Sequence, residues 1–223
     1  MIHAALLLPF ALLQASPAPA EQSRFEQCVA LIDVDAERAY EEGMAWAADA
    51  QSIDAYRCAA MALAAQNRHA EAARRFESLA TALTREESGM RATLFVQAGH
   101  AWLLEREPER ARSAFTRAVV TMEHDPQALP DLLIDRSRAY AMEGDHAAAE
   151  QDLNRALDIR GDDTLALRLR SAARLNQSAF DLAEADAVRA LQVAQTEDDR
   201  VGAALALGHA RESKRTGAIV EQQ

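Results

Sequence analysis

An internal repeat of 34 residues constrains this chain more than any other feature. Residues 130–163 read PDLLIDRSRAYAMEGDHAAAEQDLNRALDIRGDD, and residues 164 onward read TLALRLRSAARLNQSAFDLAEADAVRALQVAQ in the same pattern. Residues 92–125 and 53–80 repeat the pattern more loosely. Each unit has one helical period, a break near its middle and a second helical period. This pattern predicts helical hairpins that stack side by side, because one hairpin alone cannot bury its apolar face.

The apolar and small positions recur at fixed places in the units. The fourth place holds a large apolar residue, as in Tyr56, Phe95, Leu133 and Leu167. The eighth place holds a small residue, as in Ala60, Gly99, Ser137 and Ser171. The eleventh is large in three units, with Arg174 as the exception, and the twentieth is always alanine: Ala72, Ala111, Ala149 and Ala183. These spacings of three and four predict one continuous buried stripe on each helix.

The composition agrees with a helical chain. Hydrophobic residues make up 49% of the sequence but aromatic residues only 5%, and there are just 8 Gly and 6 Pro. Alanine supplies much of the apolar content and is the best helix former, because it loses no side-chain entropy. We therefore predict an all-α chain of about eleven helices.

The repeat resembles the tetratricopeptide repeat (TPR) in its period and in its small and large positions. We assign four TPR-like units to residues 53–86, 92–125, 130–163 and 164–197. The resemblance implies a solenoid of helical hairpins wound into a right-handed superhelix, which binds a peptide or protein in its concave groove. The proline that usually closes a unit is mostly missing, which predicts an irregular array.

The ends of the array are interpreted as caps. Residues 21–52 contain two helical stretches, and residues 198–213 form a last helix. We expect this last helix to turn its apolar side back onto the preceding unit through Val201, Ala204, Leu205 and Gly208. Residues 214–223 have no pattern and are predicted to be a disordered tail.

Residues 1–20 have the pattern of a secretory signal peptide. An apolar run from Ala4 to Leu13 is followed by Ala18-Pro19-Ala20, which fits cleavage before Glu21. The run is too short to span a bilayer, so we expect no stable membrane insertion after cleavage. The resulting expectation is an exported bacterial protein, periplasmic or secreted. An uncleaved anchor or a misassigned start codon is the alternative.

Export changes how the two cysteines are interpreted. Cys28 and Cys58 are 30 residues apart, close to one repeat, so we place them on neighbouring helices. An oxidising compartment favours a disulfide between them. The alternative is a pair of buried thiols that serve as small apolar residues.

Charge and motifs exclude several function classes. The net charge is −11, whereas a nucleic-acid-binding protein usually carries a basic stripe that neutralises phosphates. The sequence has neither a GxGxxG nor a GxxxxGK[ST] loop, and its six His residues show no metal-ligand spacing such as HExxH. We therefore expect no catalytic residues, no cofactor, no metal site and no nucleic-acid partner.

The TPR resemblance also implies which side chains line the concave groove. The candidate partner-binding residues are Arg57, His100, Leu104, Arg138, Met142 and Arg168. Our hypothesis is that Arg138, Arg168 and His100 hold an acidic or C-terminal group of a peptide, since Arg binds carboxylates through two parallel hydrogen bonds. Met142 and Leu104 would cover its side chains. In the alternative, the Arg residues are solvated or paired with neighbours such as Asp131 and Asp135.

The favoured function is a non-catalytic interaction scaffold or adaptor in the cell envelope, with an unidentified protein or peptide as its partner. A self-associating structural module is the first alternative, and a mass that rises with concentration would distinguish it. A small-molecule-binding or enzymatic accessory protein is the second alternative. It would require a closed pocket with convergent polar groups, which open solenoids rarely provide.

Overall fold

The computed structural model describes residues 23–220, and in this part of the chain it contains eleven α-helices and no strand. The helices are α1 (Arg24–Ile32), α2 (Ala36–Ala50), α3 (Ile53–Ala65), α4 (His69–Ala82), α5 (Ser88–Leu104), α6 (Pro108–Thr121), α7 (Leu129–Glu143), α8 (His146–Ile159), α9 (Thr164–Asn176), α10 (Phe180–Val193) and α11 (Glu197–Thr216). The predicted all-α class is confirmed. The proposed signal peptide, residues 1–20, lies outside the described residues.

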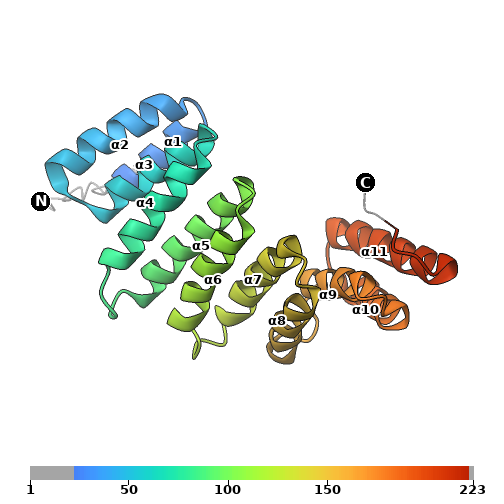
Figure 1. The fold of residues 1–223 in the computed structure, drawn as a ribbon. Coiled ribbons are helices and arrows are strands. Elements are labelled where there is room, and N and C mark those ends of the chain that lie inside the picture. Colours follow the sequence, from blue (N-terminus) through green and yellow to red (C-terminus); the bar gives the residue numbers. More distant parts are fainter. Residues whose placement is uncertain (1–22, 221–223) are drawn as a thin grey trace, which may run out of the picture.

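The helices follow one another along an elongated array, from α1 at one end to α11 at the other (Figure 1). Each helix packs on the next one in the chain, and α5, α7 and α9 also contact one another in sequence. These three are the first helices of their hairpins. We call the side on which they lie together the first-helix face. The molecule is thus a solenoid of helical hairpins.

All four predicted units turn between their helices by the same backbone geometry. The fifteenth residue of each unit is left-handed, with φ between 59° and 83°, at Asn67, Arg106, Gly144 and Ser178. The next amide then donates to the carbonyl of the eleventh residue, as in Glu107 to Trp102 at 2.9 Å. This hydrogen bond is typical of a Schellman helix end. Three of the four units adopt this conformation without glycine, so the repeat imposes the turn through the helices on either side of it.

The core is built from small residues that let neighbouring helices approach closely. In the second unit the ring of Phe115 on α6 lies directly on Gly99 of α5, and a methyl group added at Gly99 would come within 2.5 Å of the ring. Phe95, Phe115 and the surrounding alanines are fully buried. Alanine and glycine on the facing sides of neighbouring helices therefore set the distance between the helix axes. The few aromatic rings fill the space that these small residues leave between the helices.

The C-terminal helix differs from the prediction in two ways. The predicted tail begins at residue 214, but α11 continues to Thr216, where Gly217 at φ 68° ends it. The helix is longer because Lys214 bonds to Asp181 and Glu184 of α10. The buried Ser213 hydroxyl also accepts a hydrogen bond from the Val220 amide at 3.1 Å. The prediction of disorder from residue 214 is therefore wrong for the start of this segment.

The predicted inner face of α11 is also wrong. The residues that α11 buries are Ala203, Leu207, Ala210 and Ser213. Val201, Ala204, Leu205 and Gly208, which were expected to face the preceding unit, are exposed. The reason is that α11 packs on both α9 and α10, and the closest packing comes from its alanine-rich side.

Candidate functional site

The six predicted groove residues lie on four first helices, but two of them are covered by the ends of the array. Arg57 on α3 lies beneath α1, with its guanidinium 4.6 Å from the centre of the Phe25 ring. Its Nε atom is buried and has no hydrogen-bond partner. Arg57 thus stabilises the packing of α1 through a cation–π contact, and its charge does not face an open groove.

Arg168 on α9 is covered at the other end of the array. Its guanidinium lies against Gly202 of α11, and a methyl group added at Gly202 would overlap it. Gly202 is therefore the residue that makes room for this side chain between the two helices. Arg168 is part of the α9–α11 contact, so it is separated from the central part of the first-helix face.

The central residues His100 and Arg138 share one carboxylate. His100 Nε2 lies 3.1 Å from Asp135 Oδ1, and Arg138 Nη1 lies 3.2 Å from the same oxygen. The Asp135 side chain is only 14% exposed, whereas that of Arg138 is 40% exposed. The His100 ring also packs edge-on against Phe115, with 5.3 Å between ring centres. Arg138 is therefore paired with Asp135, which was one of the alternatives considered from the sequence.

Beside this cluster the first-helix face opens into an apolar pocket between α7 and α9. Its volume is about 360 Å³, and its floor comes from α8. It is lined by Leu103, Ser137, Arg138, Ala141, Met142, His146, Ala149, Leu153, Leu169, Ala172, Ala173 and Asn176. Of the predicted residues, Arg138 and Met142 line it, and Leu104 follows Leu103 at the exposed end of α5. Met142 is 51% exposed and presents apolar surface at the pocket, and Leu104 is 63% exposed next to the lining residue Leu103 in the sequence.

Two buried ion pairs escaped the sequence analysis. Arg136 donates to both carboxylate oxygens of Asp152, at 2.7 and 2.6 Å, and Arg170 does the same to Asp186 at 3.0 and 2.7 Å. The hydrogen bonds to Asp152 raise the pKa of Arg136 above its ordinary value. Each pair joins the two helices of one hairpin. The signal was present, because the two Arg and the two Asp are each 34 residues apart in the sequence.

Arg174, the exception at the eleventh place, also has a structural role. Its Nε donates to Glu150 of α8 and its Nη1 donates to Asp186 of α10, both at 2.8 Å. Gln177 donates to Glu150 as well, at 2.8 Å. Burial raises the pKa of Glu150, but the hydrogen bonds from Arg174 and Gln177 outweigh it and hold this pKa below its ordinary value. Arg174 therefore ties three helices together where other units use an apolar side chain.

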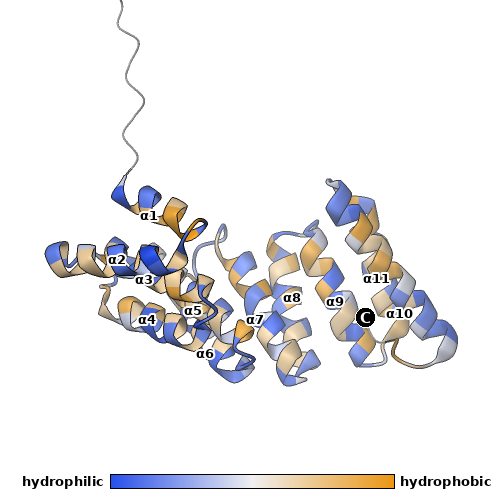
Figure 2. Ribbon diagram, turned by 90° about the horizontal axis from the view of Figure 1, so that it is seen from above, coloured by the Kyte–Doolittle hydropathy of each residue, from blue (hydrophilic) through white to orange (hydrophobic). Residues whose placement is uncertain are grey.

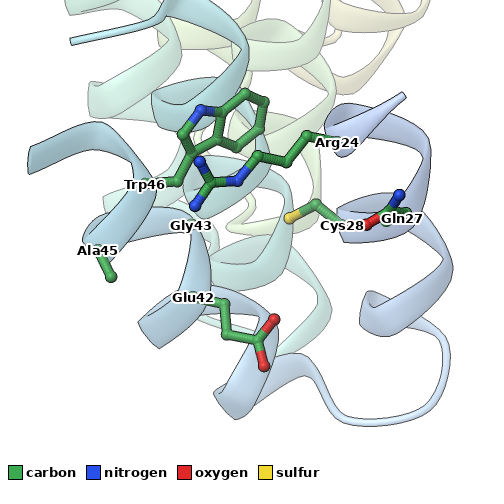
Figure 3. Close-up of a pocket in the computed structure, with 7 residues that line it drawn as sticks. All are labelled: Arg24, Gln27, Cys28, Glu42, Gly43, Ala45 and Trp46. Atoms are coloured by element: carbon green, nitrogen blue, oxygen red, sulfur yellow. The ribbon is translucent and has the colours of Figure 1, made fainter. Parts of the chain in front are cut away.

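A second pocket lies at the N-terminal end, between α1 and α2 (Figure 3). Its volume is about 340 Å³, and it is lined by Arg24, Gln27, Cys28, Glu42, Gly43, Ala45 and Trp46. The Arg24 guanidinium lies 5.0 Å from the centre of the Trp46 ring, closing one side.

The disulfide joins Cys28 on α1 to Cys58 on α3 beneath this second pocket, with their Cα atoms 6.3 Å apart. It fixes α1 over Arg57.

Among the residues that the structure describes, no group of three or more His, Cys, Asp or Glu side chains is arranged so that it could hold a metal ion. Within residues 23–220, no helix combines the length and the apolar character needed to cross a membrane. The described surface includes the apolar pocket on the first-helix face and the N-terminal pocket.

Comparisons with known proteins concern the fold. No family model and no curated protein matches the chain. Among solved structures, a thermophilic TPR protein from Thermus thermophilus matches at 20% identity, covering 82% of this chain and 96% of its own, with a TM-score of 0.53. The first TPR of Spaghetti (RPAP3), bound to an HSP90 peptide, matches at 25% identity over 56% of this chain and 93% of its own, with a TM-score of 0.48. The likeness to the Thermus protein shows that the chain has the TPR-like helical solenoid fold.

Proposed function

We propose that this chain is a non-catalytic interaction scaffold that binds a peptide segment of another protein on its first-helix face. The observation that carries the proposal is the apolar pocket between α7 and α9. It is concave, its edge includes the exposed side chain of Met142, and its floor is buried leucine and alanine. A pocket of this kind takes an apolar anchor residue, which is the usual source of affinity in peptide recognition.

The polar groups at the rim of the pocket would orient the peptide. Arg138 has a side chain 40% exposed, and Asp135 keeps its contact with His100 when Arg138 moves away, so Arg138 can turn toward a ligand carbonyl or carboxylate. Asn176 adds an exposed amide at the opposite wall. The ligand class is therefore a peptide with an apolar anchor and an acceptor group next to it.

The test is to fill the pocket without disturbing the fold. Peptides selected from a random display library on the purified chain would be titrated by fluorescence anisotropy against Ala172→Trp and Ala185→Trp. Ala172 lines the pocket, whereas Ala185 is exposed on α10, so both variants add the same ring. Ala172→Trp should raise the Kd at least tenfold, about 1.4 kcal/mol. Equal affinity in the two variants would contradict the proposal, provided that circular dichroism shows both to be folded.

We further propose that the scaffold acts outside the cytoplasm, in the cell envelope. Two features support this: the signal-like pattern of residues 1–20 and the pairing of Cys28 with Cys58, which an oxidising compartment would preserve. Mass spectrometry of the periplasmic fraction of the source cell should find a mature chain that begins at Glu21. A full-length chain confined to the cytoplasm would contradict export.

A further inference from the structure

The last helix, α11, is the first half of a hairpin whose second helix the described chain does not contain. The fourth unit begins at Thr164, so a fifth unit of the same length begins at Asp198. In that numbering Val201, Ala204, Leu205 and Gly208 occupy places four, seven, eight and eleven. Figure 2 shows α11 beside α10 at one end of the array, and α11 is the last helix of the described residues.

In the second, third and fourth units, contacts at places seven and eight are made to the second helix of the same hairpin. Gly99, at place eight, lies under Phe115 of α6. Ser171, also at place eight, donates to the Ala183 carbonyl of α10 at 2.8 Å. Arg136, at place seven, binds Asp152 of α8. In the repeat, this stripe is therefore the surface on which a helix packs.

On α11 the same stripe is open and apolar. Val201 is 52% exposed and Leu205 is 60% exposed, and Ala204 is exposed between them. A methyl group added at Gly208 would meet no atom within 4 Å. The described residues after the helix, up to Val220, do not cover the stripe, because the Val220 amide donates to the Ser213 hydroxyl on the buried side of α11.

The charges on the open side of α11 are arranged to complement a second copy of the same helix. The first turn carries Glu197, Asp198 and Asp199, and the last turn carries Arg215, while the neighbouring Lys214 is bound to Asp181 and Glu184 of α10. Helical spacing extends the stripe to Glu197, four residues before Val201, and to Arg215, seven after Gly208. Two antiparallel copies would set the acidic turn of each against the basic turn of the other.

One alignment pairs the terminal charges and brings the small residues together. Antiparallel pairing centred on residue 206 places Glu197 opposite Arg215 and Ala204 opposite Gly208. The two small residues allow the helix backbones to approach closely, and Leu205 would fill the open space beside Gly208. Glu197 and Arg215 are now paired with exposed neighbours three residues away, and such pairs are weak enough to be exchanged.

We infer that α11 is a dimerisation helix and that its partner is α11 of a second copy of this chain, packed antiparallel about a two-fold axis. The contact is self-complementary, as a two-fold interface requires. It uses the side of α11 that faces away from α9 and α10, so it leaves the apolar pocket between α7 and α9 open in each copy. A dimer would present that pocket twice and would bind a partner with repeated anchors more tightly than a monomer. The inference does not depend on the proposed peptide binding.

Sedimentation velocity of the full chain over a hundredfold range of concentration tests the association. The wild type should change from monomer to dimer and form no larger species. Leu205→Glu should raise the dimer dissociation constant at least about tenfold. Val120→Glu is the matched control, because Val120 on α6 is 66% exposed and lies outside the stripe, and it should leave the constant unchanged. A wild type that is monomeric throughout, or a dimer that Leu205→Glu does not weaken, would overturn the inference.

Charge reversal provides a second measurement that does not depend on the leucine. Chains with Arg215→Glu and chains with Glu197→Arg should each associate poorly, because like charges then meet at both ends of the pair. An equimolar mixture should recover dimers, since the two variants complement each other. Failure of the mixture to recover dimers would reject the proposed pairing, and growth of the wild type into open assemblies would indicate head-to-tail stacking instead.

Discussion

The buried pair between Arg136 and Asp152 allows the sharpest test of how the hairpins are held together. The Asp152 side chain is 6% exposed and that of Arg136 is 13% exposed, and two hydrogen bonds join them. Asp152→Ala would leave a buried guanidinium without its carboxylate. Removing one partner of such a pair typically costs about 3–5 kcal/mol. Arg136 retains a 3.5 Å contact with the Thr116 hydroxyl and some access to water, so we expect about 3 kcal/mol, the lower end of that range.

The second unit already has the residues that the double variant would introduce into the third unit. The preceding unit has Ala98 and Ala114 at the places of Arg136 and Asp152, and both alanines are buried. Arg136→Ala with Asp152→Ala removes both charges, so no unpaired ion is left in the core. The double variant should therefore be less destabilised than Asp152→Ala alone, although it removes more atoms.

The assay combines thermal unfolding with hydrogen exchange. A loss of about 3 kcal/mol should lower Tm by roughly 6–12 °C in a chain of this size. Repeat arrays do not always unfold in one step, so exchange of the amides of α7 and α8 locates the loss. If the double variant were destabilised as much as the single, or if exchange rose equally in distant helices, the reasoning from an unpaired charge would be refuted.

Three further changes probe other parts of the array. The folded chain holds the pKa of Glu150 below its ordinary value of 4.5, so its stabilisation is complete above that pH and is lost as the pH falls through the lowered value. Acid titration followed by circular dichroism should show this loss, and Glu150→Gln should remove that part of the pH dependence. Replacing Cys28 and Cys58 by alanine should cost about 3–4 kcal/mol and speed amide exchange in α1 first; unchanged exchange there would contradict the role given to the disulfide. Gly99→Ala should cost about 1–3 kcal/mol in thermal unfolding, because the added methyl group meets an aromatic ring, whereas Gly89→Ala on the same helix meets no atom within 4 Å and should be nearly neutral.

The repeat made the hairpin architecture predictable because its residues interact mainly with their neighbours. In each unit place four holds a large residue and place eight a small one. The turn at place fifteen keeps its geometry with Asn67, Arg106 or Ser178 as well as with Gly144. A pattern that recurs every 34 residues in the sequence thus produces a helical hairpin that recurs along the array. The same period could have revealed the buried ion pairs, because they recur one unit apart.

The orientation of α11 could not be predicted, because both of its sides are apolar and small. The stripe of Val201, Leu205 and Gly208 continues the repeat pattern, and the pattern assigns those places to the interior. In complete units a second helix makes them interior, and here none follows in the described chain. The opposite side, with Ala203 and Leu207, packs on the array instead. Periodicity identifies a helix-packing surface but does not say whether the same chain supplies the covering helix.

The positions of the three arginines favour apolar contact over charge as the source of peptide affinity on the first-helix face. Arg57 is covered by α1, Arg168 lies between α9 and α11, and Arg138 shares Asp135 with His100. A clamp of several free guanidinium groups would make peptide affinity fall steeply with added salt, because exposed charges are screened within about 10 Å at 0.1 M. An apolar pocket with one paired arginine at its rim predicts a weak salt dependence instead, because hydrophobic contact does not depend on screening. Measuring the Kd of a selected peptide across a range of salt concentrations separates the two. A steep slope that Arg138→Met abolishes would show that charge carries the recognition and would reject the apolar anchor.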